Sequence, residues 1–516
     1  MNKATQSVVI VGGGTAGWLT AGRIAAEHRG QGIKGLSVTL VESPNVSPIG
    51  LGEGTWPTMR NTLMKMGISE TEFIRQCDGS FKQGAKFAKW VDGRENDFYY
   101  HPLVLPQGFH KTNLAAHWAR DTHLNSQSFS QAVCFQEAIC ELGLAPKTIR
   151  TPEYDAIANY AYHLDAAKFC AFLQKHCVDK LGVRHVLADV EQVHMEENGD
   201  IGAVITHQAG KIEGDLFVDC TGFSALLIDK HFQIPFKPCD DILFIDSALT
   251  VQVPYPEPES PIASHTISTA QPAGWIWDIG LQHRRGVGYA YASCYTTEEQ
   301  AKQCLADYVG PQFAGLSVRK ISIKSGHREK FWHKNCVAVG LSAGFLEPLE
   351  ASALVLVELS AQMIAEQMPA CREAMDVIAN RFNQTFRYRW QRIIDFLKLH
   401  YVLSKRSDNL FWVDNRKPES IPDSLQELLT LWRYHTPGDH DFTSNNEVFP
   451  AASYQYILYG MGFHTDTTLM RHKLTDTQLA AQQFSLNQQA ITKASDLLPT
   501  NRELINKIFQ YGLQPI

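Results

Sequence analysis

Three glycines near the N-terminus have the spacing of a nucleotide-binding turn, Gly12-x-Gly14-x-x-Gly17, and they follow the apolar residues 8–11. In such a turn Gly12 allows the tight bend, Gly14 lets the backbone approach a pyrophosphate, and Gly17 lets the helix pack on the strand. The N–H groups at the start of the helix then bind the phosphates. Glu42 ends the second apolar run and supplies an acceptor for a ribose hydroxyl. The pattern predicts a dinucleotide site; a purely structural glycine turn is the alternative.

A second glycine-rich segment follows at residues 48–57 and contains Gly52-Glu53-Gly54-Thr55. Its glycines and prolines predict a loop rather than a helix or strand. Small residues suit a close backbone approach to a ligand, and an ordinary surface loop is the alternative.

Residues 80–90 alternate in polarity, which predicts one strand with Lys82 and Lys86 on the same face. From this pattern alone a solvated lysine is expected more often than a catalytic one.

Aromatic side chains and histidines, among them His101, are dense between residues 98 and 165. Such density suits a pocket for a flat ring, although an ordinary core would also explain it. Residues 274–280 predict a strand with Trp275, Trp277 and Ile279 on one face. Here too the pattern alone favours core packing. The histidines lack metal-ligand spacing, so no metal site is expected.

These segments imply an α/β fold of the Rossmann-like, doubly wound type. Apolar strands at 8–11, 37–41, 215–219 and 335–339 predict a parallel sheet with its ligand at the carboxyl edge, near Gly222 and Gly340. We expect a nucleotide-binding module over residues 1–375. Within it, 236–325 form an inserted, largely antiparallel sheet and 80–160 face the substrate. Residues 376–516 are expected to form a mostly helical substrate module.

The composition narrows the class of protein. The 516 residues are 44% hydrophobic and 20% charged, which is typical of a globular protein. A net charge of −7 without a basic cluster argues against nucleic acid as a partner. No apolar run has the length of a membrane helix, and the first strand begins too early to leave room for a cleavable signal. Eleven scattered cysteines suggest thiols of a reducing compartment, so a cytoplasmic enzyme is expected.

The chain resembles the flavin-dependent tryptophan halogenases over nearly its whole length. The resemblance depends on segments 12–18, 52–55, 80–82, 162–165, 219–223, 275–279 and 345–350, above all on the tryptophan pair and Glu347-Pro348-Leu349-Glu350. It implies FAD, reduced by a separate flavin reductase, and a chloride or bromide ion. Reduced flavin, O₂ and halide give hypohalous acid, which passes through an internal tunnel and halogenates an electron-rich aromatic ring.

The resemblance also implies roles for particular residues. Lys82 would hold or activate the hypohalous acid, and Glu350 would stabilise the cationic ring and accept its proton. Trp275 and Trp277 would shield the flavin from the substrate. The implied cofactor-binding residues are Gly12, Gly14, Thr15, Ala16, Gly17, Glu42, Gly52, Glu53, Gly54, Thr55, Gly222, Gly340 and Leu349. Those implied for the halide are Ser352 and Ala353, and those for the substrate are His101 and Tyr454.

The sequence departs from the family pattern at three places. Ala351-Ser352-Ala353 stands where the family usually has Ser-Thr-Gly around the halide, but backbone donors survive this change. Gly280 replaces a usual proline after Ile279, and Leu103 replaces a common aromatic. Residues that would grip an amino-acid backbone are not recognisable, which favours another indole or a phenol over free tryptophan.

Two other functions remain open at this stage. One is an aromatic monooxygenase that hydroxylates its substrate directly, and the other is a FAD-binding protein that has lost halogenation. A homodimer is one oligomeric state compatible with the sequence.

Overall fold

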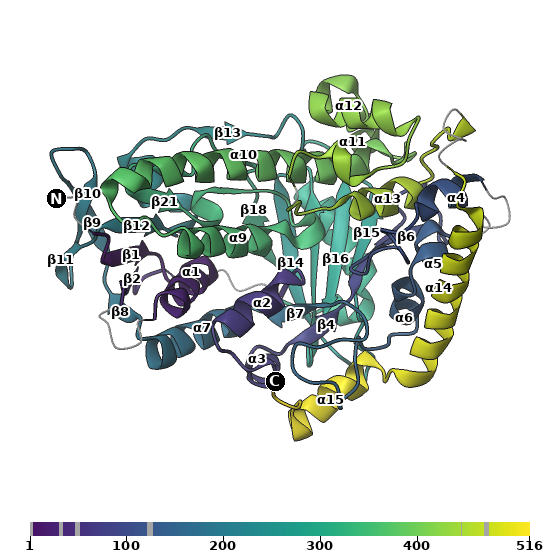
Figure 1. Cartoon of the computed structure of the whole chain (residues 1–516), viewed down its shortest axis with the longest axis horizontal. Coiled ribbons are helices and arrows are strands. Elements are labelled where there is room, and N and C mark those ends of the chain that lie inside the picture. The colour runs from purple at the N-terminus through teal and green to yellow at the C-terminus, as the bar shows by residue number, and fades with distance from the viewer. Residues whose placement is uncertain (1–3, 30–34, 47–51, 121–126, 445, 469–473) are drawn as a thin grey trace. The chain divides into compact units, whose positions relative to one another are not determined.

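The computed structural model describes residues 4–29, 35–46, 52–120, 127–444, 446–468 and 474–516 (Figure 1). Pro48-Ile49-Gly50-Leu51, the start of the second glycine-rich segment, therefore lies outside the described residues. The chain divides into two compact units, each made of three segments. The first unit is Met1–Gly79, Leu164–Cys239 and Lys324–Trp390, and the second is Ser80–His163, Asp240–Ile323 and Gln391–Ile516. The domain boundaries expected from the sequence stay a prediction.

A six-stranded sheet forms the centre of the first unit, in the order β20-β21-β12-β1-β2-β8. Its strands are β1 (Ser7–Val11), β2 (Ser37–Glu42), β8 (Arg184–Leu187), β12 (Leu216–Asp219), β20 (Trp332–His333) and β21 (Cys336–Ala338). All neighbours except β20 and β21 pair in parallel. Val8, Val9, Ile10 and Val11 of β1 are almost completely buried, as expected for an interior parallel strand. The predicted Rossmann-like α/β fold is confirmed.

Five helices of the first unit accompany this sheet: α1 (Thr15–Glu27), α2 (Thr58–Lys65), α3 (Glu70–Gln76), α7 (Ala166–Leu181) and α9 (Ser352–Glu366). Helix α1 packs against both α7 and α9. Asp165 caps the start of α7, where its side chain accepts a hydrogen bond from the Lys168 N–H at 3.0 Å. The long helix α10 (Arg372–Val402) begins in this unit and ends in the second.

The remaining strands of the first unit are short. An antiparallel sheet joins β9 (Val190–Met195), β10 (Ile201–Thr206) and β11 (Gly210–Glu213), and another joins β13 (Phe236–Pro238), β19 (Gly326–Arg328) and β22 (Gly344–Phe345). Residues 52–54 form strand β3 (Gly52–Gly54), so the loop expected over 48–57 is wrong at that position.

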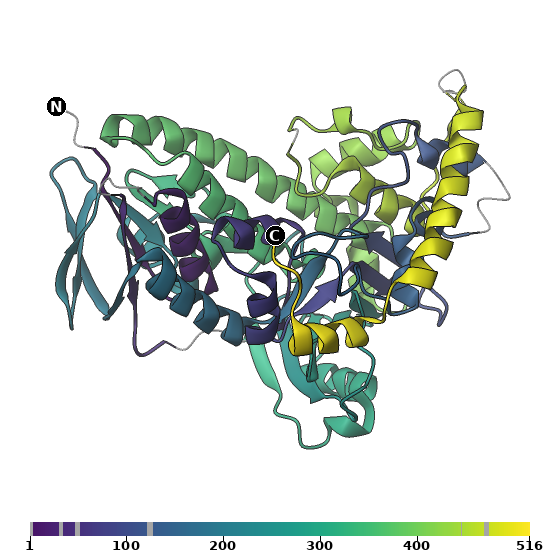
Figure 2. The same cartoon turned by 60° about the horizontal axis from the view of Figure 1, so that its bottom comes forward.

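The second unit is organised on a seven-stranded sheet, β18-β14-β17-β16-β15-β5-β6. Its strands are β5 (Gly84–Ala88), β6 (Phe98–Pro102), β14 (Ser247–Pro254), β15 (Thr266–Gln271), β16 (Gly274–Gly280), β17 (Arg284–Tyr291) and β18 (Arg319–Ser322). Only β15 and β5 pair in parallel, so the expectation of a largely antiparallel sheet is confirmed. Helix α8 (Glu298–Val309) packs on β14 and β17, in teal in Figure 2.

The single strand expected over residues 80–90 is wrong, because the chain breaks into β4 (Ser80–Lys82) and β5 at Gln83. The Gln83 N–H donates to the Ser264 carbonyl at 2.7 Å, and Gly84 has a φ of +154°. Strand β4 pairs with β7 (Ala161–Asp165), not with the neighbours of β5. Lys82 and Lys86 therefore do not share one face of one strand.

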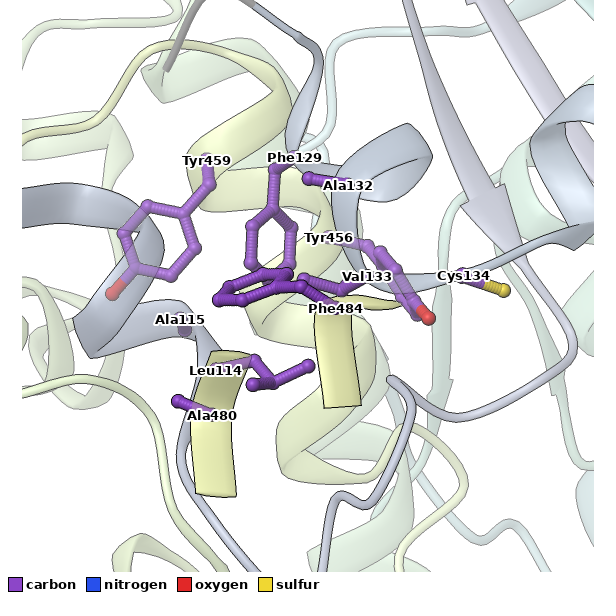
Figure 3. Packing of buried hydrophobic residues seen from close by; sticks show 10 residues of the cluster. All are labelled: Leu114, Ala115, Phe129, Ala132, Val133, Cys134, Tyr456, Tyr459, Ala480 and Phe484. Atoms are coloured by element: carbon purple, nitrogen blue, oxygen red, sulfur yellow. The ribbon is translucent and has the colours of Figure 1, made fainter. Parts of the chain in front are cut away.

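Helices dominate the rest of the second unit, as expected for residues 376–516. They are α4 (Leu114–Arg120), α5 (Phe129–Val133), α6 (Gln136–Glu141), α11 (Leu410–Asp414), α12 (Asp423–Trp432), α13 (Ala451–Gly460), α14 (Thr477–Leu497) and α15 (Asn501–Tyr511). Figure 3 shows α4, α5, α13 and α14 joined by one apolar cluster, with Phe129 between Tyr456 and Tyr459. This cluster fixes α13, the helix that carries Tyr454.

Candidate active site

The glycine turn after β1 has the geometry that its spacing predicts. Gly12 has a φ of +116°, and a Cβ there would lie 2.2 Å from the Cys220 carbonyl oxygen. A Cβ on Gly17 would lie 1.9 Å from the Gly12 oxygen, so only glycine lets α1 pack this tightly. Next to Gly14 nothing lies within 4 Å of an added Cβ. Open space thus borders the first turn of α1, where Thr15 and Ala16 present their backbone.

Glu42 reaches this turn from the end of β2. A Cβ on Gly13 would lie 2.1 Å from the Glu42 carboxyl carbon, so the carboxylate rests directly on the turn. The Glu42 carboxylate also accepts a hydrogen bond from His185 Nε2 at 2.8 Å, from the neighbouring strand β8. An acid held against a glycine turn fits the ribose of a dinucleotide. These residues therefore fit the adenosine diphosphate part of FAD.

Two further predicted cofactor residues, Gly222 and Gly340, lie in turns at the carboxyl end of the same sheet. Asp219, completely buried, accepts hydrogen bonds from Thr221, Leu227 and Ile228 and so fixes the chain around Gly222. Gly340 has a φ of +76°, and a Cβ there would lie 2.8 Å from the Ala16 Cβ. The parallel strands thus bring the glycine turns 12–17, 222 and 340 to one edge.

The Gly52-Glu53-Gly54-Thr55 segment contributes a carboxyl group, that of Glu53. Burial raises the pKa of Glu53 to about 7. Thr55 is fully buried, and the Trp56 indole donates to the Glu350 carbonyl at 2.8 Å. This bond joins the segment to the turn before α9.

Glu350 and Ala351 form an unusual turn at the start of α9. Their φ values are +63° and +53°, so two consecutive residues other than glycine adopt the left-handed region. Such backbone strain is concentrated at functional sites. Ala351 offers no side chain to cap the helix, so the first N–H groups of α9, from Ser352 and Ala353 onward, remain available to an anion. Leu349 and Ser352 are buried, while Ala353 is exposed.

A second carboxyl group of α9 is buried behind this turn. Glu358 is 2% exposed and accepts hydrogen bonds from the hydroxyls of Thr62 at 2.7 Å and Thr58 at 3.3 Å. Burial raises the pKa of Glu358 to about 8. At neutral pH the group is therefore mainly protonated.

Lys82 is buried in the second unit, with 2% of its surface exposed, so the expectation of a solvated lysine is wrong. Its strand β4 pairs with β7 in the register Ser80↔His163 and Lys82↔Ala161, which places the side chains of Lys82 and His163 on the same face. Burial and then the Lys82 ammonium hold the pKa of His163 well below its usual range. His163 is therefore a neutral neighbour of the lysine.

Trp275 and Trp277 share one face of β16, as predicted, with ring centroids 6.0 Å apart. Their positions depend on small residues of β17. Gly288 lies opposite Trp277, and a Cβ there would lie 2.1 Å from the indole Cζ2. Ala290 lies opposite Trp275 in the same way. Gly288 is thus a site residue that the sequence analysis missed, although the alternation of small residues in β17 was a signal.

His101 and Tyr454 both lie in the second unit and are buried. His101 Nε2 lies 2.9 Å from the Ser453 hydroxyl, which ties β6 to α13. Both rings pack near Phe396, with centroid distances of 5.5 and 4.9 Å. Phe396 in turn stacks on Phe449 at 3.9 Å. The density of aromatic residues in the sequence therefore corresponds to a packed aromatic cluster.

The predicted site residues divide between the two units. The first unit holds the cofactor residues together with Glu350, Ser352 and Ala353, and the second holds Lys82, the tryptophan pair, His101 and Tyr454. Gly13, Asp219, Gly288 and His163 also line these positions, and none of them was predicted from the sequence to have a role of its own. Gly13 and Asp219 lie within recognised motifs, and for Gly288 the signal was the alternation of small residues in β17.

Comparison with known proteins identifies the family. The sequence model described as tryptophan halogenase matches residues 7–476. The chain belongs to the tryptophan halogenase family. The 7-chloro-L-tryptophan 6-halogenase KtzR of Kutzneria sp. (strain 744) is 32% identical, over 97% of this chain and 99% of its own length.

Solved structures of tryptophan halogenases have the same fold. A tryptophan halogenase from Shewanella frigidimarina NCIMB 400 superposes with a TM-score of 0.95 and 49% identity, covering 100% of this chain and 99% of that one. The tryptophan C-6 flavin-dependent halogenase (chlorinase) of taromycin biosynthesis gives 0.89 and 32%, covering 98% and 99%. This chain is thus an enzyme of a flavin-dependent halogenase family, and direct hydroxylation, the alternative from the sequence, is not favoured.

The described parts of the chain show neither a membrane span nor a metal cluster. They contain no helix with the length and apolar character needed to cross a bilayer. Nor do these residues group three or more histidine, cysteine or acidic side chains as a metal site would require.

Proposed function

We propose that this halogenase transfers chlorine or bromine to an electron-rich, indole-like aromatic substrate, with Lys82 as the catalytic lysine. The observation that carries the proposal is the burial of Lys82 beside the neutral His163, because an ammonium is seldom placed in such a position without a function. Free tryptophan is a weaker candidate than another indole or a phenol, since no residues for binding an amino-acid backbone are recognisable.

The residues of the first unit would hold FAD. Gly12, Gly14 and Gly17 with Thr15 and Ala16 bind the pyrophosphate, and Glu42 binds the adenosine ribose. The remaining contacts come from Gly52, Glu53, Gly54, Thr55, Gly222, Gly340 and Leu349. When bound in reduced form, FAD supplies with O₂ the oxidation that turns a halide ion into hypohalous acid.

The start of α9 would bind the halide. The backbone N–H groups at Ser352 and Ala353 have no side-chain cap to compete with an anion, and the helix dipole favours a negative charge there. Because these donors belong to the backbone, the change from the usual family residues leaves them in place.

Lys82 and Glu350 would share the halogen transfer. The Lys82 ammonium donates a hydrogen bond to the oxygen of hypohalous acid and makes its halogen more electrophilic. The ring carbon then forms its bond to the halogen as the oxygen–halogen bond breaks, and the departing hydroxide takes a proton from Lys82 to become water. Glu350 stabilises the cationic ring and accepts the proton of the broken C–H bond.

The remaining residues that we assign would contact the substrate or separate it from the flavin. Trp275 and Trp277 would keep the aromatic substrate apart from the flavin, and His101 and Tyr454 would contact the substrate. A separate flavin reductase would supply reduced FAD. We place the enzyme in the cytoplasm, since all eleven cysteines are free thiols, as is usual in a reducing compartment.

A product assay tests this proposal. The full chain is incubated with FAD, a flavin reductase, NADH, O₂ and bromide or chloride. Indoles and phenols are offered one at a time as substrates, and the products are identified by mass spectrometry. We expect halogenated products that disappear in Glu350→Gln and require halide. Hydroxylated products formed equally well without halide would contradict the proposal.

A further inference from the structure

Four arginines are buried in the described part of the chain, and one of them lacks an acidic partner. The other three each hold a carboxylate at 2.5, 2.8 and 2.6 Å, as the pairs Arg23–Glu27, Arg328–Asp229 and Arg406–Asp408. Arg502 forms no ion pair with any described residue. Since a guanidinium stays charged in proteins, this exception needs an explanation.

Arg502 is the second residue of α15 and is 6% exposed. Its Nε donates to the Ser260 carbonyl at 2.8 Å and its Nη1 to the Gln282 carbonyl at 2.7 Å. Both acceptors are neutral. Nη2 is buried and finds no hydrogen-bond partner within the described ranges. One edge of a buried cation is thus left without a ligand.

No carboxylate of the described residues forms an ion pair with this guanidinium, although the charge of Glu259 raises the pKa of Arg502. Glu259 is exposed, and its carboxylate accepts from the Asn506 amide at 3.1 and 3.3 Å. Burial lowers the pKa of Arg502, and this effect exceeds the opposing influence of Tyr255 and Glu259. A buried charge without an ion-pair partner is destabilising, so a bound anion would stabilise this region.

A second donor lies beside the guanidinium. The Arg502 guanidinium carbon is 5.1 Å from the centroid of the Tyr255 ring, and the Tyr255 hydroxyl is buried with no partner among the residues that are described. Burial raises the pKa of Tyr255 to about 12, so the phenol stays neutral and can donate. Gly280 makes room for it, because a Cβ at Gly280 would lie 2.9 Å from the Tyr255 oxygen. The Gln282 amide oxygen is also buried without a partner, and turning that amide would present a third donor.

We propose that Arg502 and Tyr255 bind a halide ion, at a site separate from the one at the start of α9. Both unpartnered atoms are buried, so we choose the smallest anion that could accept hydrogen bonds from them, a monatomic one. The choice of halide rests on the proposed function, which requires chloride or bromide to be present. The neighbouring Asn501 donates to the Phe81 carbonyl at 3.2 Å. Asn501 precedes Arg502 in α15 and contacts strand β4, which carries Lys82, so a halide at Arg502 stabilises the contact between α15 and this strand.

Bromide diffraction tests the site directly. Crystals of the full chain grown in sodium bromide are measured at the bromine absorption edge. We expect an anomalous peak within hydrogen-bonding distance of Arg502 Nη2, and its absence from Arg502→Met crystals. A water molecule without anomalous signal at that position in the wild type would overturn the proposal, whatever is seen at Ser352.

Thermal unfolding tests the site in solution. Bromide is titrated at constant ionic strength, without reductase or aromatic substrate. Occupancy of this one site at bromide about nine times its dissociation constant lowers the unfolding equilibrium constant about tenfold. Arg502→Met should lose that factor, and Tyr255→Phe, a milder variant that keeps the ring, should weaken it.

Arg406→Met is the matched control, because this buried arginine has its own carboxylate, and it should keep the full bromide dependence. Equal bromide dependence in wild type and Arg502→Met would refute the site. Both measurements are independent of Lys82, so a failure of the proposed catalytic role and a failure of this site are distinguishable.

Discussion

Replacing Gly288 with alanine should displace Trp277 and weaken the wall that we assign to the tryptophan pair. The added Cβ would lie 2.1 Å from the Trp277 Cζ2, whereas ordinary carbon contacts lie at about 3.5–4.0 Å. The indole must therefore move by roughly 1.5 Å, because its clash is with a rigid ring rather than with the end of a flexible chain.

The cost follows from overpacking. Insertion of a methyl group into a packed site costs about 1–3 kcal/mol, and the gain from a less flexible unfolded chain offsets about 0.4–1 kcal/mol of this. We expect a net loss near 1–2 kcal/mol in the free energy of unfolding, measured by urea denaturation, with a shifted tryptophan emission spectrum.

Gly286→Ala on the same strand is the matched control. Its Cβ would lie 3.1 Å from Cγ1 of Ile279, so that side chain has to move far less than Trp277 does, and a smaller change is expected. If Gly288→Ala unfolds at the same urea concentration as Gly286→Ala and its Trp277 has not moved in a crystal structure, the packing argument is refuted.

Three further predictions concern the cofactor and halide side of the enzyme. Gly17→Ala, whose Cβ would lie 1.9 Å from the Gly12 oxygen, should raise the dissociation constant for FAD at least about tenfold in a fluorescence titration; unchanged affinity would contradict our account of the turn. Ala351→Gly should stabilise the protein by about 0.5–1 kcal/mol, because φ at this residue is +53°. Ala353→Gly, inside α9, should destabilise it by a similar amount. Thermal unfolding of both variants measures these two changes, and equal effects of the two would contradict the prediction. For Glu358 the pKa of about 8 in the folded state exceeds that in the unfolded state, so the native state binds an extra proton. The free energy of unfolding of the wild type should therefore fall by roughly 3 kcal/mol from pH 5.5 to 8.5, relative to that of Glu358→Gln. If the two proteins depend on pH in the same way, the carboxyl is not buried as described.

The cofactor side of the fold could be predicted from the sequence because its determinants are local. Gly12 needs a positive φ and Gly17 a missing Cβ, and both requirements are visible as residue types at a fixed spacing. Glu42 could be assigned for the same reason, since it ends a recognisable strand.

Lys82, our proposed catalytic lysine, could not be singled out from the residue pattern, because its environment depends on distant segments. The alternation of residues 80–90 continues through Gln83, yet the chain turns there to bond with Ser264 and lets β4 pair with β7. Only family resemblance singled out Lys82. The space for Trp277 likewise depends on Gly288 in another strand, and pairing across a sheet is not readable from one strand.

The most direct test of the central claim compares two lysine variants from the same region of the chain. Lys82→Met is assayed beside Lys86→Met, whose wild-type lysine is partly exposed and pairs with Glu141 at 2.6 Å. Both variants are supplied with reduced FAD, O₂, bromide and an aromatic substrate that the wild type halogenates. The halogenated product is measured by mass spectrometry, and the affinity for FAD is measured separately. We expect Lys82→Met to bind FAD normally and yield no halogenated product, while Lys86→Met remains active. Product from Lys82→Met at the wild-type rate would contradict the assignment of this lysine.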